Sequence, residues 1–259
     1  MSHTAGIDIG SITTKAAVMR DDVLLGSRVI FTGYNSEAAG RRVYEELLDE
    51  LGLDRTQVGR IVATGYGRKS VTIADKAVTE IMCHAAGARY LEPSVRSLID
   101  IGGQDSKAVV MDEGGRVTNF TMNDKCAAGT GRFLEVMARA LEADLDEFGM
   151  LSLKAEQPAK ISSLCTVFAE SEVISLIAKG ETRENIIAGI HEAIASRVSA
   201  MAGRIGLTAP VMMTGGVARN IGVVRALEKA IGAPVSVSSH AQVNGAIGAA
   251  CLAREVKSA

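Results

Sequence analysis

The sequence contains an internal repeat that constrains the architecture of the whole chain. The segment IDIGSITTKAAVM, residues 7–19, aligns without a gap with IDIGGQDSKAVVM, residues 99–111, and eight of the thirteen positions are identical. Such a match in a chain without low complexity indicates a duplicated unit. Each copy begins as an alternating apolar strand, turns at glycine and resumes as a second strand. The repeat predicts two related lobes, each built on a strand–turn–strand hairpin, that face each other across a cleft.

Helix and strand patterns alternate over the rest of the chain. The patterns predict helices over residues 36–53, 73–93, 183–207, 223–233 and 245–259, and short strands over residues 60–65, 210–216 and 235–238. Ser36 is the expected N-cap of the first helix, and Gly52 is its expected stop. This alternation is typical of an α/β fold with mixed sheets. We expect lobe I over residues 1–95 and lobe II over residues 96–243.

Composition excludes several classes of protein. The formal charge of −2 and the pI of about 6.1 do not favour nucleic acid or an acidic membrane surface as a partner. No apolar run approaches the roughly 18 residues that span a bilayer. The first residues carry neither a basic nor an apolar signal region, so we expect a cytoplasmic protein with reduced cysteines. Aromatic residues make up only 3% of the chain against 27 glycines, which suits close backbone approach.

The turn of the first repeat copy has the residues of a phosphate site. Asp8 ends the strand, where its carboxylate suits Mg²⁺ directly or through water. Gly10 lets the backbone turn tightly and expose N–H groups toward an anion. Three hydroxyl groups and one cation follow in the turn: Ser11, Thr13, Thr14 and Lys15.

The second copy supplies a matching turn. Its candidate residues are Asp100, Gly102, Gly103, Gln104 and Asp105. Two such turns on opposite walls would clamp a triphosphate–metal complex, and Gln104 would orient an attacking water. One copy alone is more often an ordinary hairpin turn, because Gly and Asp are common in turns. The presence of two copies favours the phosphate interpretation.

A third glycine-containing segment supports this interpretation. In VMMTGGVARN, residues 211–220, an apolar strand runs into Gly215 and Gly216 and then toward a helix, with Asn220 at the junction. Glycines at this point would let a flat adenine–ribose group lie against the backbone.

The order of these segments resembles a large superfamily. GIDIGSITTK, IDIGGQDSK, VMMTGGVARN and GAIGAACLA are similar to the two phosphate loops, the adenosine loop and the closing helix of the actin, sugar kinase and Hsp70 ATPase superfamily. The resemblance spans almost the whole chain. It implies a duplicated actin-like, ribonuclease H-like fold with ATP in the cleft, and a last helix, residues 244–259, that returns to lobe I.

The four cysteines fall into two pairs. Cys83 lies in an expected helix and Cys251 among small apolar residues, so both are expected in the core, where free cysteine packs as a small hydrophobe. His84 next to Cys83 does not make a metal pair, because neighbours on a helix point in different directions. Cys126 and Cys165 each lie in a turn of small or hydroxyl residues just before a helix. The positive end of the helix dipole there stabilises a thiolate or an anionic cluster.

Position alone leaves two interpretations of Cys126 and Cys165. They are ordinary loop cysteines, or they are metal ligands. No CxxC motif occurs, so one chain does not supply a four-cysteine zinc or iron–sulfur site. Two chains that meet on a two-fold axis would supply four cysteines.

The segments around the cysteines resemble one family. MNDKCAAGTGRFLEVMA, ISSLCTVFAESEVIS and ATGYGR are similar to segments of the ATP-dependent activators of 2-hydroxyacyl-CoA dehydratases, a family that includes the ATPase subunits of benzoyl-CoA reductase. The resemblance implies one [4Fe-4S] cluster bridging a homodimer, with Cys126 and Cys165 of each subunit as its ligands. It further implies that reduced ferredoxin or flavodoxin supplies an electron, that ATP hydrolysis lowers the cluster potential, and that a two-subunit dehydratase receives the electron in an anaerobic host.

Three other interpretations remain open at this stage. A small-molecule kinase of pantothenate- or sugar-kinase type would share the phosphate and adenosine segments. A non-catalytic assembly protein would use ATP as a switch, and an ATPase subunit of a benzoyl-CoA-type reductase would serve aromatic reduction. The cysteine turns argue against the first two. The turn at residues 63–68 suits a lobe interface, a docking surface or an ordinary glycine-rich turn.

Overall fold

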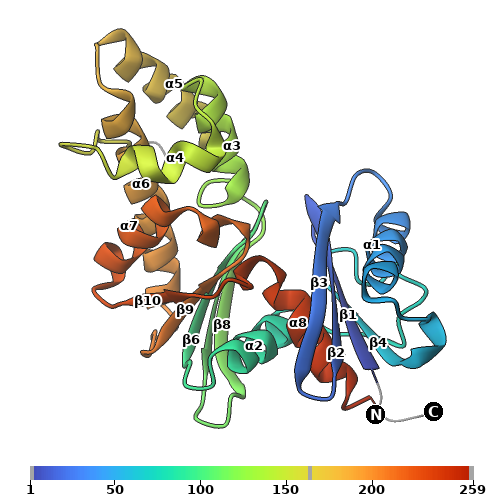
Figure 1. Cartoon of the computed structure of the whole chain (residues 1–259). Coiled ribbons are helices and arrows are strands. Elements are labelled where there is room, and N and C mark those ends of the chain that lie inside the picture. The colour runs from blue at the N-terminus through green and yellow to red at the C-terminus, as the bar shows by residue number, and fades with distance from the viewer. Residues whose placement is uncertain (1–2, 163–164, 257–259) are drawn as a thin grey trace. The chain divides into compact units, whose positions relative to one another are not determined.

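The computed structural model describes residues 3–162 and 165–256, which fold into two compact units (Figure 1). Unit 1 contains residues 1–98, 111–118 and 238–259, and unit 2 contains residues 99–110 and 119–237. The chain therefore passes between the units more than once. The lobe boundaries expected from the sequence stay a prediction.

Unit 1 is built on a mixed five-stranded sheet with the order β3-β2-β1-β4-β5. Its strands are β1 (His3–Ile9), β2 (Thr13–Arg20), β3 (Val23–Phe31), β4 (Val58–Thr64) and β5 (Lys76–Ala77). β1, β2 and β3 are successively antiparallel, whereas β4 runs parallel to both β1 and β5. The hairpin of the first repeat copy is therefore present, and it pairs Asp8 with Lys15 across its two strands.

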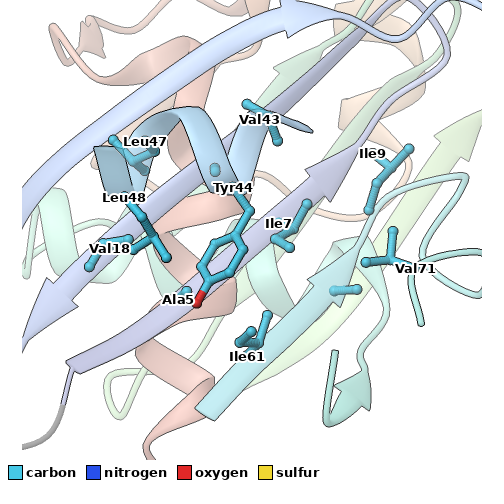
Figure 2. Close-up of a cluster of buried hydrophobic side chains, with 12 residues drawn as sticks. Ala5, Ile7, Ile9, Val18, Val43, Tyr44, Leu47, Leu48, Ile61 and Val71 are labelled. Atoms are coloured by element: carbon cyan, nitrogen blue, oxygen red, sulfur yellow. The ribbon is translucent and has the colours of Figure 1, made fainter. Parts of the chain in front are cut away.

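Helix α1 (Ser36–Leu51) covers one face of this sheet. Alternate residues of a strand point to the same face, and Ile7 and Ile9 of β1 lie on the face that meets α1. They pack with Tyr44 and Leu47 of α1, which lie three residues apart on one face of the helix and are fully buried (Figure 2). The apolar side chains on one face of β1 and on one face of α1 thus form one continuous core.

Helices α2 (Glu80–Leu91) and α8 (Asn244–Ala253) cover the opposite face. α8 packs on β1, β2 and β4, and α2 packs on α8. These approaches require glycine: a Cβ on Gly6 of β1 would lie 2.0 Å from the Ala246 carbonyl oxygen, and one on Gly248 would lie 1.7 Å from the Cys83 carbonyl oxygen. Glycine and alanine therefore lie where the backbones of β1, α2 and α8 approach one another closely.

The second five-stranded sheet repeats the first. Its strands are β6 (Ser97–Ile101), β7 (Ser106–Met111), β8 (Val117–Asn123), β9 (Val211–Thr214) and β10 (Val235–Val237), in the order β10-β9-β6-β7-β8. Read from its other end, this order matches strand for strand the order of the first sheet. The duplication inferred from the repeat is confirmed.

The helices of unit 2 lie in sequence between β8 and β10, with β9 between α6 and α7. They are α3 (Gly131–Ala140), α4 (Leu145–Ser152), α5 (Thr166–Ala178), α6 (Arg183–Gly203) and α7 (Ile221–Ile231), and the short 3₁₀ helices of the chain are η1 (Arg55–Gln57), η2 (Gly216–Arg219) and η3 (Ala241–Val243). α3 packs against α5, and α6 packs against α4 and α7.

Three sequence expectations need correction. The helix expected over residues 73–93 begins only at Glu80, because Lys76 and Ala77 pair with β4 as a short edge strand. The N-cap of α1 is Asn35 and not Ser36, since the Asn35 side chain accepts the Ala38 N–H. Gly52 ends α1 in the left-handed region, at φ 63°, as expected. The last expected helix is shorter than predicted, because α8 ends at Ala253 and residues 254–256 are not helical. Residues 257–259 of that expected helix lie outside the described residues.

A buried histidine lies in the helical part of unit 2. His191 of α6 is 1% exposed, and its ring makes an edge-to-face contact with Phe148 of α4 at 5.6 Å between centroids. Its Nε2 lies 3.3 Å from Nδ2 of Asn220. Because that amide nitrogen is a donor, Nε2 accepts, and the ring is held neutral. Burial lowers the pKa of His191 to about 3.

The free energy of unfolding should therefore depend on pH through His191. Between pH 3 and the usual histidine pKa of about 6.5, the unfolded chain binds a proton that the folded chain excludes, so stability rises with pH by up to about 1.4 kcal/mol per unit. Urea unfolding between pH 4 and 6 should show a shallower pH slope for His191→Gln than for the wild type. His240→Gln, at a partly exposed histidine, should keep the wild-type slope. An unchanged slope in His191→Gln would contradict this assignment.

Candidate functional site

The first phosphate turn connects β1 to β2 in unit 1. The Gly10 N–H donates to the Thr13 carbonyl oxygen at 3.1 Å, which closes the turn. The Thr32 hydroxyl donates to the Gly10 carbonyl oxygen at 2.8 Å and lies 2.9 Å from the Thr14 hydroxyl. Ser11 is exposed, whereas Thr14 is completely buried. The structure thus presents Ser11 at the surface of the turn and uses Thr14 to anchor it.

A buried carboxylate lies beside this turn. Asp8 is 5% exposed, and its Oδ2 lies 3.6 Å from Lys15 Nζ. Two glycines give it room: a Cβ on Gly65 would lie 2.5 Å from Asp8 Oδ1, and a Cβ on Gly245 would lie 2.8 Å from Asp8 Oδ2. Gly65 has φ 85°, which favours glycine on conformational grounds as well.

The second turn, between β6 and β7 in unit 2, has the same construction. The Gly102 N–H donates to the Asp105 carbonyl oxygen at 2.9 Å, at the positions equivalent to Gly10 and Thr13. Lys107 Nζ lies 3.2 Å from Asp100 Oδ2 and 2.6 Å from Asp105 Oδ2. The repeat therefore places one carboxylate, one closed glycine turn and one lysine in each unit.

The turn at residues 63–68 also belongs to the duplication. Gly65 follows β4, the parallel neighbour of β1, and Gly215 follows β9, the neighbour of β6. Gly215 has φ 88°, and its Cβ would lie 2.2 Å from the Ile101 carbonyl oxygen, as that of Gly65 would lie 2.5 Å from the Ile9 carbonyl oxygen. The Thr214 hydroxyl donates to Asp100 Oδ1 at 2.8 Å. The shared Thr-Gly pair after a buried strand is the signal that identifies both turns.

The start of α3 is bonded directly to the second phosphate turn. The Gly131 N–H donates to the Gly102 carbonyl oxygen at 2.9 Å, and the Arg132 N–H donates to the Gly103 carbonyl oxygen at 2.8 Å. These are two of the N–H groups that a helix leaves unpaired at its first turn. Gln104, between Gly103 and Asp105, is exposed at the tip of the turn and has no hydrogen-bond partner among the described residues.

The expected adenosine loop runs from β9 through η2 to α7. Asn220 is the N-cap of α7, and its Oδ1 accepts the Val223 N–H at 3.2 Å while its Nδ2 faces His191. The side chain of Asn220 is therefore already engaged in holding the loop. Gly215 and Gly216 leave the backbone of the loop uncovered by side chains of their own.

Cys126 and Cys165 lie where turns lead into helices, as predicted. Cys165 is the N-cap of α5 and is exposed. Cys126 is half-buried, four residues before the N-cap Thr130 of α3. The Asn123 side chain brackets Cys126, since its Nδ2 donates to the Cys126 carbonyl oxygen at 2.8 Å and its Oδ1 accepts the Cys126 N–H at 3.3 Å. The two following helices, α3 and α5, pack against each other.

Of the other two cysteines, Cys83 is buried in the core and Cys251 is partly buried against it. Burial raises the pKa of Cys83 to about 12 and that of Cys251 to about 11, so neither is prepared to act as a thiolate ligand. Over residues 3–162 and 165–256, no group of three or more His, Cys, Asp or Glu side chains is placed to hold a metal ion.

Comparison with known proteins decides the family. The model of the BadF/BadG/BcrA/BcrD ATPase family matches residues 5–253. The chain belongs to this ATPase family. An activator of lactoyl-CoA dehydratase from Anaerotignum propionicum is 48% identical over 254 residues, covering 98% of this chain and 98% of that protein. A benzoyl-CoA reductase subunit from Thauera aromatica is 34% identical over 240 residues, covering 89% of this chain and 84% of that protein. The family resemblance seen in the cysteine segments is confirmed.

Solved structures confirm the actin-like fold of this ATPase family member. Component A of (R)-2-hydroxyglutaryl-CoA dehydratase from Acidaminococcus fermentans superposes with a TM-score of 0.95 at 45% identity, covering 98% of each chain. The activator of 2-hydroxyisocaproyl-CoA dehydratase from Clostridium difficile with bound ADPNP gives 0.93 at 44% identity, covering 99% of each chain. A ROK family glucokinase from Streptomyces griseus gives 0.63 at 14% identity, covering 98% of this chain and 100% of that one, a likeness of fold alone.

The structure thus gathers the predicted site residues into separate local groups. Asp8, Gly10, Ser11, Thr13 and Lys15 share one turn, and Asp100, Gly102, Gly103, Gln104 and Asp105 share the other. Sequence reasoning missed Gly65, Gly245 and His84, which surround Asp8. Helical spacing alone does not reveal such contacts, because these residues come from three distant elements. Among the described residues, no helix has the length and apolarity that crossing a bilayer requires.

The packing around Asp8 predicts the effect of one methyl group. In Gly245→Ala, the new Cβ would lie 2.8 Å from Asp8 Oδ2 and 2.9 Å from His84 Nε2, both buried, so overpacking should lower the free energy of unfolding by about 1–3 kcal/mol. Gly203→Ala is the matched control, because Gly203 ends α6 with no atom within 4 Å of its Cβ position. Urea unfolding should show the loss in Gly245→Ala only. Equal stability of the two variants would contradict the described packing.

Proposed function

We propose that this chain is an ATP-hydrolysing iron–sulfur activator that delivers a low-potential electron from ferredoxin or flavodoxin to a two-subunit 2-hydroxyacyl-CoA dehydratase. The relatives that support this proposal are named as activators of such dehydratases, and one was solved with bound ADPNP. The expected site of action is the cytoplasm of an anaerobic host. The hydroxyacyl group would be chosen by the dehydratase, since activation requires no acyl-CoA site on this chain.

The nucleotide is assigned to the duplicated turns. The proposed binding residues are Gly10, Ser11, Thr13, Thr14, Lys15, Gly102, Gly103, Asp105, Gly215, Gly216 and Asn220. Thr14 and Asn220 would act by holding the backbone, because their side chains are already bonded within the protein. Asp8 and Asp100 fit Mg²⁺, which prefers carboxylates with retained water, and each of these carboxylates lies at the end of a buried strand beside its turn. Gln104, exposed and without a partner in the described structure, would orient the attacking water.

Cys126 and Cys165 fit a [4Fe-4S] cluster shared by two copies of the chain. Cys165 is exposed and Cys126 is half-buried. Both lie at or just before a helix N-terminus, where the dipole stabilises the negative charge of a thiolate-bound cluster. Four cysteine ligands would come from two chains. Side chains of α5 support a homodimer, because Val167, Phe168, Ile174 and Ile177 are all between 44% and 67% exposed. The bound cluster would supply one-electron transfer.

The observation that carries the proposal is that the second phosphate turn is hydrogen-bonded to the start of α3, the helix that follows the Cys126 turn. Gly102 and Gly103 accept hydrogen bonds from Gly131 and Arg132, and Cys126 lies five residues before Gly131. A change of the turn between ATP and ADP would therefore be transmitted to the start of α3, and through its packing to α5. Solvent exposure and hydrogen bonding at the sulfurs are among the factors that set cluster potential.

The required energy is compatible with a nucleotide switch. For one electron, 59 mV corresponds to about 1.4 kcal/mol, so a shift of ~200 mV needs about 5 kcal/mol. A nucleotide shifts an equilibrium by its differential affinity for the two states, and a factor of about 10⁴ in affinity supplies this amount.

Cluster binding tests the proposal directly. Anaerobically prepared dimer should contain about four irons per two chains, and Cys126→Ser and Cys165→Ser should each lose the iron and the visible absorption. Cys251→Ser, which also removes one thiol, should keep the iron and the visible absorption, because Cys251 is a partly buried residue of α8 that packs against the core of unit 1. Iron analysis and absorption spectroscopy after reconstitution make the measurement. A colourless, monomeric wild type would refute the proposal.

A further inference from the structure

A large hollow lies beside both cysteine turns in unit 2. It has a volume of about 940 Å³ and is bounded by the end of β8, by the segment at residues 158–162 and by α6. Asn123, Asp124 and Lys125 on its wall lead directly into Cys126, and Ser162 lies three residues before Cys165. The hollow is therefore bordered by the two segments that carry the cysteines.

The hollow carries an excess of positive charge. Lys125, Lys160, Arg197 and Arg204 line it, and none of the four has an ion-pair partner among the residues that the structure describes. Its acidic residues are Asp124 and Glu192, and Glu192 is already paired with Lys229 at 2.8 Å. Unpaired cations of this number favour an anionic partner.

The position of the cations distinguishes a protein partner from a small ligand. Lys125, Lys160 and Arg204 are exposed at the rim, and only Arg197 is half-buried. The stem of Arg197 lies on the Cys126 turn, because its Cδ would be 3.2 Å from a Cβ on Gly129. Exposed rim charges steer a charged protein surface into contact, whereas a small anion would need buried donors around it.

We propose that this basic hollow is the docking surface of an acidic electron-carrier protein. The inference rests on the proposed function and deepens it by locating the donor. A cluster held by the cysteines would accept one electron from the docked reduced carrier, with no covalent bond formed or broken. The apolar residues Met122, Ile161 and Met201 between the cations supply the contact that remains when salt screens the charges.

The test uses the holo dimer and a reduced bacterial two-cluster ferredoxin. At low salt, Lys125→Glu/Lys160→Glu should slow cluster reduction by ferredoxin and weaken ferredoxin binding by at least about 10-fold. At about 0.5 M salt the difference from the wild type should be smaller, because salt screens the charges. Reduced methyl viologen, a small cation, should reduce this variant at least as fast as the wild type. Arg20→Glu/Lys76→Glu, the same charge change on exposed residues of unit 1, should behave like the wild type.

Several outcomes would overturn the docking proposal. Unchanged ferredoxin affinity in Lys125→Glu/Lys160→Glu would overturn it. An equal loss of ferredoxin affinity in the control, Arg20→Glu/Lys76→Glu, would also overturn it. Saturable inhibition of ferredoxin binding by pyrophosphate at constant ionic strength would identify the hollow as a small-anion site instead. Ferredoxin binding is measured independently of the cluster, so a wild type without iron would refute the proposed function while the binding assay still tests the surface.

An independent observation concerns His84, beside Asp8 in unit 1. Asn244 Nδ2 donates to the His84 carbonyl oxygen at 3.0 Å and lies 3.3 Å from His84 Nδ1. A carbonyl oxygen only accepts, so the amide orientation is fixed with its nitrogen toward His84. Nδ1 therefore faces a donor and must accept, which leaves the ring proton on Nε2.

The protonated nitrogen and the Asp8 carboxylate both border the space that Gly245 leaves without a side chain. A Cβ on Gly245 would lie 2.9 Å from His84 Nε2 and 2.8 Å from Asp8 Oδ2. Asp8 Oδ2 also faces Lys15 Nζ at 3.6 Å. We infer that His84 is a positioning residue, whose Nε2–H orients the Asp8 carboxylate toward Mg²⁺·nucleotide. This inference rests on the metal role proposed for Asp8.

Two substitutions separate orientation from packing. His84→Leu should lower kcat for ATP hydrolysis and weaken Mg²⁺-dependent ADP binding, each by about 10–100-fold, the usual effect of losing a residue behind a metal ligand. His84→Gln, whose amide keeps an N–H donor, should stay within about 5-fold of the wild type, and metal-free ADP affinity should be unchanged in both variants. Calorimetry with and without Mg²⁺ makes the binding measurement.

The inference about His84 fails on either of two results. Wild-type kcat and wild-type Mg²⁺-dependent ADP affinity in His84→Leu would show that the ring does not act on Asp8. Equal losses of kcat and of this affinity in His84→Leu and His84→Gln would show that His84 has a packing role alone. If Asp8→Asn leaves Mg²⁺-dependent binding intact, the metal role proposed for Asp8 fails first.

Discussion

The fold depends on a glycine turn that closes behind a buried carboxylate. In each unit a fully buried strand ends in Asp-Ile-Gly, and the glycine N–H bonds to the carbonyl three residues on, as Gly10 bonds to Thr13 and Gly102 to Asp105. The returning strand brings a lysine to the carboxylate, which would otherwise be buried without a counter-charge. A second glycine on the parallel neighbour, Gly65 or Gly215, leaves the space that this arrangement needs. The same closed glycine turn occurs in both units. In each unit it determines how the two strands pair and places the lysine beside the carboxylate.

The two copies differ in what is attached to the turn. The first turn is tied to the loop before α1 through Thr32, and it is surrounded by α2 and α8 through His84 and Gly245. The second is tied to the first N–H groups of α3, beyond the Cys126 turn. Duplication therefore produced one turn set in a rigid core and one turn joined to the segment that carries a surface thiol. This difference makes a nucleotide-driven change at the cysteines physically reasonable.

The sequence allowed much of this to be predicted, and particular residues show why. The repeat revealed both phosphate turns, because Asp, Gly and Lys keep the same spacing in each copy. It did not reveal that Lys76 and Ala77 form an edge strand, since a two-residue strand has no period of its own and depends on pairing with β4. Asn220 and Thr14 are proposed nucleotide-binding residues, and only the structure shows that their side chains are hydrogen-bonded within the protein. His84 lies beside Asp8 only because α2, β1 and α8 meet there, and sequence spacing does not report such a meeting.

The most direct test of the account is amide hydrogen exchange in the stretch from Cys126 to Glu135, measured with and without Mg²⁺·ATP analogue. The account predicts that nucleotide at the turn around Gly102 changes the exchange of the Gly131 and Arg132 N–H groups, which bond to that turn, and of the cysteine turn before them. If the nucleotide protects residues 100–107 while exchange over residues 126–135 stays the same, the link between phosphate turn and cysteine turn does not operate.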